Sequence, residues 1–345
     1  MKDVHIPRNR NGGIFIDAEN VKLHSNDFDH TEKLNQLTDT ERSHVDTYIS
    51  NCEKALDSLN KINQPIALTE TSPWEYHYST NRHHFPLKNY IIHAFPILKP
   101  YLISNSKKCR ILECGCGTGS TLLPLMRYCS NENASFVGFD VSSTALSFFL
   151  NHPIAEKYTK DNRLQLFKFD TSGNFPQSSI DSTQNSESQI KRPRSEQLKT
   201  TLIDAMGAAF PSSGDEKFDV VLLVFVLSAL PTLSGMISTL KQIREVIKPD
   251  GFLLFRDYAL PDHNFFRFIK NNNNELGELF FKKGDSTTQL FFEEKFTKRL
   301  MKASGFDEHL DEQFKLQYHC NRIINRKTGK FMDKVFLNGV FSPYL

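Results

Sequence analysis

Glu-Cys-Gly-Cys-Gly-Thr-Gly-Ser at residues 113–120 is the stretch that decides the fold of this chain. It follows an apolar segment that predicts a β-strand, and it leads into a segment over 120–128 with the pattern of a helix. Gly115 and Gly117 permit a tight turn and a close approach of the backbone to a ligand, while the start of the next helix offers oriented N–H groups. A glycine turn in this context predicts a nucleotide-type ligand site in an α/β protein.

Carboxylates end the next two predicted strands. Asp140 follows the strand over 135–139, where a carboxylate can accept hydrogen bonds from both ribose hydroxyls, and Asp170 ends the third strand. A nicotinamide dinucleotide site needs a third glycine where this chain has Leu122. Taken singly, Asp140 also fits a helix cap and Asp170 a turn. Acidic residues at three successive strand ends favour a cofactor site at the carboxyl edge of a parallel sheet.

Strand and helix patterns alternate along the rest of the chain. An almost wholly apolar segment over 218–226 is typical of a central parallel strand, and a fifth strand is predicted over 252–256. Late strands over 314–321 and 335–341 complete the pattern. We predict an α/β, Rossmann-like fold with a mostly parallel, seven-stranded sheet and helices on both faces.

Two regions lie outside this alternation. Residues 1–97 form a predicted N-terminal extension, polar at first and then helical over 38–62 and 87–98, where apolar residues recur at helical spacing. Residues 98–345 form the α/β domain. Its insertion around 172–214 is predicted to be disordered, because its middle is rich in Ser, Gln and Asn and lacks an apolar pattern.

The composition argues against several classes of protein. Lys and Arg number 42 against 40 Asp and Glu, so an RNA partner has to be met by a local basic patch. The six cysteines form no C-x-x-C pair, which argues against a disulfide framework and a metal site. The uncharged run over 220–240 contains Ser, Thr, Pro and Gly, and is interpreted as a buried strand and a helix start rather than a membrane span. We expect a reducing compartment, the cytoplasm, with the nucleus as an alternative.

Four segments resemble the tRNA 3-methylcytidine methyltransferases. They are residues 220–229, residues 255–263 with their Phe-Arg-Asp-Tyr sequence, residues 277–292, and Trp-Glu-Tyr-His-Tyr at 74–78. The resemblance implies a class I methyltransferase that uses S-adenosylmethionine. It also implies a substrate, N3 of cytidine 32 in the anticodon loop of tRNA, with serine and threonine tRNAs expected.

The resemblance further implies roles for single residues. Glu113 holds the methionine ammonium, Asp140 the ribose and Asp170 the adenine amine. Trp74 and Tyr78 share one face of a predicted helix and are expected to close the cofactor pocket as a lid, with simple packing of the extension on the sheet as the alternative. The complete predicted cofactor set is Trp74, Tyr78, Glu113, Gly115, Gly117, Gly119, Asp140, Asp170 and Val224.

Asp257 and Arg256, at the end of the fifth predicted strand, are the candidate catalytic residues. Cytosine N3 carries a free lone pair at neutral pH, so its methylation needs alignment and desolvation rather than a general base. The base must be single-stranded or flipped to expose N3. Asp257 is expected to stabilise the positive charge that develops on the base, and Arg256 to hold a phosphate or the carboxylate. A structural Arg256–Asp257 pair is the alternative.

Basic residues in two regions are predicted to contact the anticodon arm of tRNA. They are Arg82 and Lys88 on the extension, and Arg322, Arg326, Lys327 and Lys330 near the C-terminus. A solvated basic hairpin is an equal alternative for the second group. An aminoacyl-tRNA synthetase such as seryl-tRNA synthetase is a candidate partner, and neither a membrane nor a metal is expected. The competing functions are a methyltransferase for a protein or a small molecule, and a cofactor-binding subunit without activity.

Overall fold

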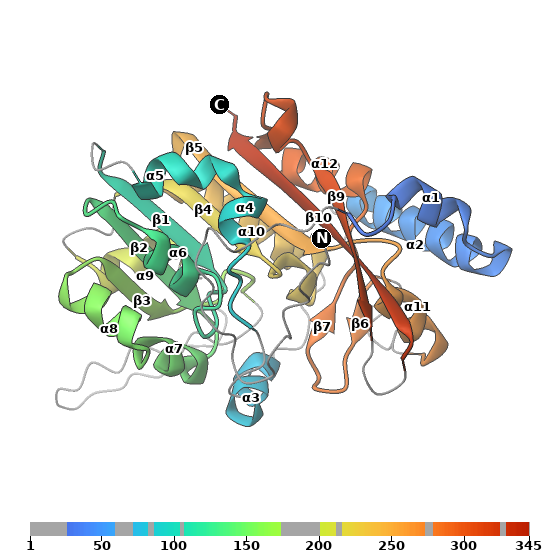
Figure 1. The fold of residues 1–345 in the computed structure, drawn as a ribbon, viewed down its shortest axis with the longest axis horizontal. Coiled ribbons are helices and arrows are strands. Elements are labelled where there is room, and N and C mark those ends of the chain that lie inside the picture. Colours follow the sequence, from blue (N-terminus) through green and yellow to red (C-terminus); the bar gives the residue numbers. More distant parts are fainter. Residues whose placement is uncertain are drawn as a thin grey trace, which may run out of the picture.

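The main element of the fold is an eight-stranded sheet with the order β3-β2-β1-β4-β5-β10-β8, in which β9 also pairs with β10 (Figure 1). The computed structural model describes residues 26–58, 72–81, 86–103, 107–173, 201–211, 216–272, 279–324 and 329–344. The strands of the sheet are β1 (Cys109–Cys114), β2 (Ala134–Asp140), β3 (Leu164–Lys168), β4 (Phe218–Val224), β5 (Ile247–Tyr258), β8 (Phe306–Glu308), β9 (Gln317–Ile324) and β10 (Phe331–Pro343).

The first five strands are parallel, and β10 runs antiparallel to β5, β8 and β9. From β1 the chain builds outward through β2 and β3, and then returns to build through β4 and β5 on the other side of β1. Such a reversal leaves a crevice at the carboxyl ends of β1 and β4, the usual ligand site of this architecture. The predicted Rossmann-like fold is confirmed. The seven predicted strands correspond to β1–β5, β9 and β10. Within this sheet, the three-residue β8 is the strand that the sequence did not predict.

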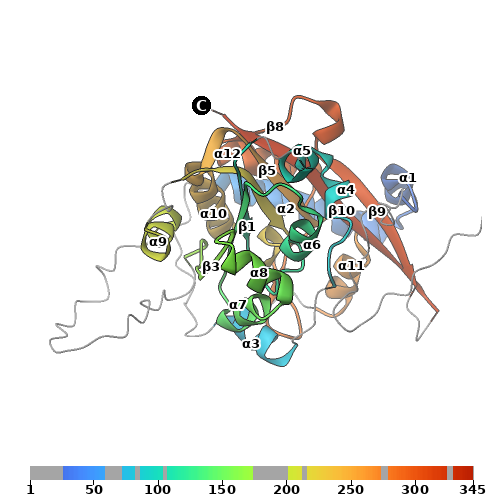
Figure 2. The same cartoon turned by 60° about the vertical axis from the view of Figure 1, so that its left-hand side comes forward.

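Helices cover both faces of the sheet, with α5 and α6 on one side and α9 and α10 on the other (Figure 2). The two faces are filled by separate apolar clusters, one containing Leu98 and Leu125 and the other containing Met236 and Phe296. The helices are α1 (His30–Asn35), α2 (Asp39–Ser58), α3 (Pro73–Thr80), α4 (Ile91–Ala94), α5 (Lys99–Ile103), α6 (Leu122–Tyr128), α7 (Ser143–Leu150), α8 (Pro153–Lys160), α9 (Leu202–Ala209), α10 (Leu233–Val246), α11 (His263–Lys270) and α12 (Glu294–Ala303).

The predicted helix over 38–62 corresponds to α2, which joins the core of the α/β domain. Val45 and Cys52 on its inner face are buried in the same cluster as α10 and α12. The hydroxyl of Tyr48 donates to the carbonyl of Leu279 (2.8 Å) and accepts from the amide of Phe291 (3.0 Å). This helical part of the extension is therefore built into the domain. Residues 1–25 lie outside the described part of the chain.

Two expectations about helices were wrong. The segment 87–98 is not one helix: α4 ends at Ala94, and a separate turn begins at Pro96, whose ring removes a backbone N–H and breaks the helix. The insertion around 172–214 is not disordered throughout, because its end forms α9. A capping box between Thr201 and Asp204 starts this helix, whose apolar face packs on α10. Residues 174–200 and 212–215 lie outside the described residues.

Candidate active site

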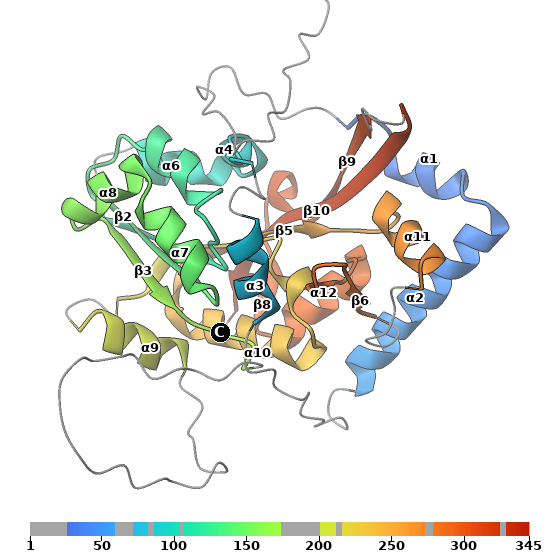
Figure 3. The same ribbon diagram turned by 90° about the horizontal axis from the view of Figure 1, so that it is seen from below.

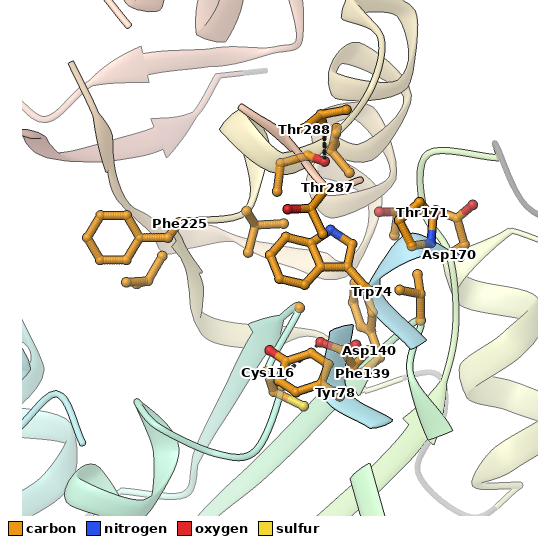
Figure 4. Close-up of a pocket in the computed structure, with 18 of the residues that line it drawn as sticks. Trp74, Tyr78, Cys116, Phe139, Asp140, Asp170, Thr171, Phe225, Thr287 and Thr288 are labelled. Carbon is orange, nitrogen blue, oxygen red and sulfur yellow. Dashed lines mark hydrogen bonds between the residues drawn. The ribbon is translucent and has the colours of Figure 1, made fainter. Parts of the chain in front are cut away.

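A pocket lies at the carboxyl ends of β1, β2 and β4, and α3 crosses over it from the N-terminal extension (Figure 3). Seven of the nine predicted cofactor residues line this pocket, and Glu113 and Gly119 are not among its lining residues. Figure 4 shows the indole of Trp74 reaching across the pocket, with Tyr78 and Asp140 below it and Asp170 to one side. The residues that were predicted and that line the wall are Trp74, Tyr78, Gly115, Gly117, Asp140, Asp170 and Val224.

The glycine turn brings the backbone against the pocket, as predicted. Gly117 has φ +52°, and a Cβ added there would meet the hydroxyl of Tyr78 at 2.5 Å, so only glycine fits. Its amide donates to Oδ2 of Asp140 (2.8 Å), which ties the turn after β1 to the end of β2. Gly119 has φ +82° and packs on the ring of Phe149 instead of facing the pocket.

The two strand-end aspartates are held in place by local hydrogen bonds. Asp140 accepts from the amides of Gly117 and Ser142 (2.8 and 2.9 Å), and burial raises the pKa of its carboxyl to about 6. Asp170 accepts from the amide and the hydroxyl of Ser172 (2.9 and 2.6 Å). Both carboxylates line the pocket, and an ionised carboxylate accepts hydrogen bonds.

Glu113 is a buried carboxylate after β1 that interacts electrostatically with the Lys88 ammonium. Glu113 is 2% exposed, and its Oε2 is buried without a hydrogen-bond partner among the described residues. Burial raises the pKa of Glu113 to about 7, against the effect of the Lys88 ammonium, and burial lowers the pKa of Lys88 to about 8. An unsatisfied buried oxygen is costly, and it fits a ligand that brings an ammonium group.

Lys88 does not lie where the sequence analysis placed it. It lines the pocket, and its ammonium donates to the hydroxyl of Ser120, while its amide donates to the Ser120 carbonyl (2.7 Å). This location differs from the outer, RNA-contacting patch predicted for Lys88 and Arg82, and Arg82 itself lies outside the described residues.

Helix α3 is held from both sides of the pocket. Glu75 accepts from the hydroxyl of Thr144 at the start of α7. On the opposite side, Nδ1 of His77 lies 2.8 Å from Oδ2 of Asp285, in the turn between β6 (Phe281–Lys282) and β7 (Thr288–Gln289). These anchors fix the helix so that Trp74 and Tyr78, four residues apart, both face the pocket, which is the placement expected for a lid.

The candidate catalytic residues lie behind the pocket wall instead of in it. Asp257 is fully buried, accepts from the amides of Ser228 and Tyr258 (3.0 and 2.8 Å), and has its pKa raised to about 6 by burial. Arg256 is 3% exposed and packs against aromatic rings. Consecutive residues of a strand point to opposite faces, so the alternative of an Arg256–Asp257 pair is wrong as well.

The sequence analysis missed part of the wall. Phe225, just after β4, lines the pocket, as do Thr287 and Thr288 of the β6–β7 hairpin (Figure 4). The hydroxyl of Thr288 donates to the carbonyl of Ala229 (2.6 Å) and so fastens the hairpin to the loop after β4. The one sequence signal for this hairpin was its place within the family-like segment 277–292.

The predicted C-terminal RNA contacts are only partly within the described chain. Arg322 is exposed on β9 and pairs with Asp333 of β10 (2.7 Å). Lys330 is exposed and lies directly before β10. Arg326 and Lys327 lie outside the described residues. Within the described ranges, no helix has the length and hydrophobicity for a membrane span, and no three His, Cys, Asp or Glu residues gather as metal ligands.

Comparisons with known proteins agree with this site. A model of the methyltransferase domain family matches residues 82–309. Human tRNA N(3)-cytidine methyltransferase METTL6 is 28% identical over 78% of this chain and 78% of its own length. The tRNA(Thr) (cytosine(32)-N(3))-methyltransferase of Saccharomyces cerevisiae is 25% identical over 78% of this chain and 36% of its own length. O-methyltransferase 3 of Dictyostelium discoideum is 27% identical over 68% of this chain and 44% of its own length.

The cofactor also fits the residues that are present. The unpaired Oε2 of Glu113 suits the methionine ammonium, Asp140 suits the ribose hydroxyls and Asp170 suits the adenine amine. The relatives confirm the resemblance seen in the sequence. With a family match that spans more than half of its length, this chain belongs to the methyltransferase domain family and is an S-adenosylmethionine-dependent methyltransferase.

Proposed function

We propose that this enzyme methylates N3 of cytidine in tRNA. The observation that carries the proposal is the similarity to METTL6, which extends over 78% of both chains. Carboxylates suited to the cofactor are present at the strand ends, and Asp140 and Asp170 line the pocket, which argues against a subunit without activity.

The chemistry asks little of the protein beyond alignment. When bound, S-adenosylmethionine supplies an electrophilic methyl group. Cytosine N3 attacks with its own lone pair, so the reaction needs no general base. Trp74 and Tyr78 cover the cofactor side and exclude water, which favours attack by the base over hydrolysis.

The finer features of the substrate follow from the same resemblance. We propose cytidine 32 of the anticodon loop as the target, in serine tRNA, threonine tRNA or both. A loop nucleotide is already unpaired, so that flipping it costs little. A synthetase, seryl-tRNA synthetase first among them, is the proposed partner, and the cytoplasm the proposed location, with the nucleus as the alternative.

Methylation of tRNA by the purified full-length chain tests the proposal. After incubation with S-adenosylmethionine, nucleoside mass spectrometry should find 3-methylcytidine in serine or threonine tRNA, and none in transcripts with uridine at position 32. Asp140→Ala should abolish the product. O-methylated product, from RNA or from small phenols, would favour the chemistry named in the Dictyostelium relative and overturn the proposal.

A further inference from the structure

Helix α3 contacts the β6–β7 hairpin at two points that involve opposite charges. At the first, Nδ1 of His77 lies 2.8 Å from Oδ2 of Asp285. At the second, the ammonium of Lys283 lies over the ring of Trp74, 5.2 Å from its centre. Both hairpin residues belong to the turn between β6 and β7. We call these four residues the α3–hairpin latch.

The members of the latch also interact within each element. The rings of Trp74 and His77, three residues apart on α3, meet edge to face with their centres 5.2 Å apart. In the hairpin turn, burial lowers the pKa of the Lys283 ammonium, and the charges of Asp285 and Asp257 oppose this shift. The four residues therefore form a closed ring of interactions, so that the loss of one member weakens the contacts of the others.

The hydrogen bond between His77 and Asp285 has only one possible direction. Although burial raises the pKa of the Asp285 carboxyl, hydrogen bonds from His77 and Thr287 hold this pKa well below its usual value. An ionised carboxylate can only accept, so Nδ1 of His77 carries the hydrogen. The imidazole is 1% exposed and the carboxylate side chain 27% exposed, so salt screens this charge-assisted bond less than a bond at the surface.

The latch reaches the cofactor pocket through Trp74. Of its four members, only Trp74 belongs to the lining that the structure describes, and its indole reaches across the pocket (Figure 4). Asp285 also accepts from the amide and the hydroxyl of Thr287 (3.1 and 2.6 Å), which lines the pocket as well. The latch therefore connects two parts of the pocket wall, α3 and the hairpin, from outside.

The position of α3 depends on such contacts. A helix of eight residues has little stability of its own. Towards α7, Glu75 accepts from the hydroxyl of Thr144. Towards the hairpin, the latch supplies the contacts of the face that carries the indole. Without the latch, α3 would keep its anchor on α7, while the indole would lose the residues that support it over the pocket.

We infer that His77, Asp285 and Lys283 are positioning residues, which hold Trp74 over the bound cofactor and thereby slow its dissociation. They act through the indole rather than by touching the cofactor. This role concerns the retention of S-adenosylmethionine, and it is the same for any methyl acceptor. It is therefore independent of the proposed tRNA substrate.

His77→Phe tests the hydrogen bond of the latch, because phenylalanine keeps a ring against Trp74 and Tyr78 but cannot donate to Asp285. We expect Kd for S-adenosylhomocysteine to rise about threefold to tenfold, the effect of one lost hydrogen bond. The dissociation rate of labelled S-adenosylmethionine, chased with excess S-adenosylhomocysteine, should rise by a similar factor. Ser79→Ala, on the exposed side of α3, is the matched control and should change neither value.

Two hairpin variants test the same role from the other element. Asp285→Ser keeps an oxygen that can accept the amide of Thr287 but is too short to reach His77, so its effect should equal that of His77→Phe. The double variant should bind no more weakly than either single one, because both changes break the same bond. Lys283→Met keeps the length of the side chain without its charge, and should weaken binding about twofold to fivefold.

A variant without the indole separates positioning from simple stabilisation of the fold. In a Trp74→Ala background, His77→Phe should weaken S-adenosylhomocysteine binding by less than about twofold more. An equal loss with and without the indole, whatever the melting temperature, shows that the pair does not act through Trp74 and overturns the assignment. Wild-type Kd and dissociation rate in both His77→Phe and Asp285→Ser overturn it too. No RNA is present in these measurements, so their outcome does not depend on whether 3-methylcytidine is formed.

Discussion

The two sides of the active site are built in different ways. The cofactor side consists of Glu113, Asp140 and Asp170, which lie at or just after the ends of three adjacent parallel strands, β1, β2 and β3. The other side combines α3, the β6–β7 hairpin and Phe225. On the first side, each functional residue is fixed by a local strand-end motif. On the second, functional residues meet only through tertiary packing, and the two sides therefore differ in how far sequence can predict them.

The two sides also differ in charge. Buried acids dominate the cofactor side, whereas Phe225, Thr287 and Thr288 on the other side carry no charge. A zwitterionic, hydroxyl-rich cofactor suits the first environment, and the neutral base of the proposed substrate suits the second. Substitutions of the acids should therefore change cofactor affinity, and those of uncharged residues that contact the base should change turnover.

Asp140→Ala should have the largest effect. Hydrogen bonds to an ionised group contribute about 1.5–3 kcal/mol each, so losing two to the ribose should weaken S-adenosylmethionine binding at least about a hundredfold in calorimetry. Asp307→Ala, which removes an exposed carboxylate on β8, is the control. Unchanged affinity in Asp140→Ala would remove the main distinction between the two sides.

The pH dependence of cofactor binding should reveal the buried Glu113. Its carboxyl has a pKa of about 7 and must be ionised to hold the methionine ammonium. Affinity should therefore rise with pH and level off above about 7, with a loss of up to tenfold per pH unit between about 7 and 6 from Glu113, and a steeper loss below about 6, where Asp140 is protonated as well. Calorimetry between pH 5.5 and 7.5 measures this. Glu113→Gln should bind weakly at every pH, and a wild-type profile without slope would contradict the assignment.

The sequence predicted the cofactor side because each of its signals is local. A glycine turn and strand-end acids have fixed positions relative to their own strands, so Gly115, Gly117, Asp140 and Asp170 were correctly expected to face one pocket. Lys88 was misplaced because a basic residue in a polar segment carries no sign of burial. Asp257 was placed on the correct strand, but its burial was not predicted. One of the amides that donate to its carboxylate, that of Ser228, comes from the segment after β4.

Trp74→Ala tests whether α3 serves the cofactor side or only packs on it. The indole crosses the pocket, so its loss should weaken cofactor binding about fivefold to tenfold, with little change in melting temperature. Trp74 is the only tryptophan in the chain, and its fluorescence in the wild-type enzyme should change when cofactor is added. Tyr76→Ala, on the exposed face of the same helix, is the control. If cofactor does not change the fluorescence and Trp74→Ala is merely less stable, Trp74 only packs α3 against the domain.

Asp257→Asn should change cofactor affinity least, by no more than about twofold. The carboxylate accepts two backbone amides, and an asparagine oxygen with its adjacent NH2 group can satisfy only one of them. A buried amide left unpaired costs about 1–3 kcal/mol, so the free energy of unfolding should fall by that amount. Because Ser228 leads into the pocket residues Ala229 and Leu230, turnover should fall modestly along with stability. Asp250→Asn, at an exposed position of the same strand, should leave stability, affinity and turnover unchanged. A hundredfold loss of turnover at unchanged stability would instead restore Asp257 as the group that stabilises the base cation.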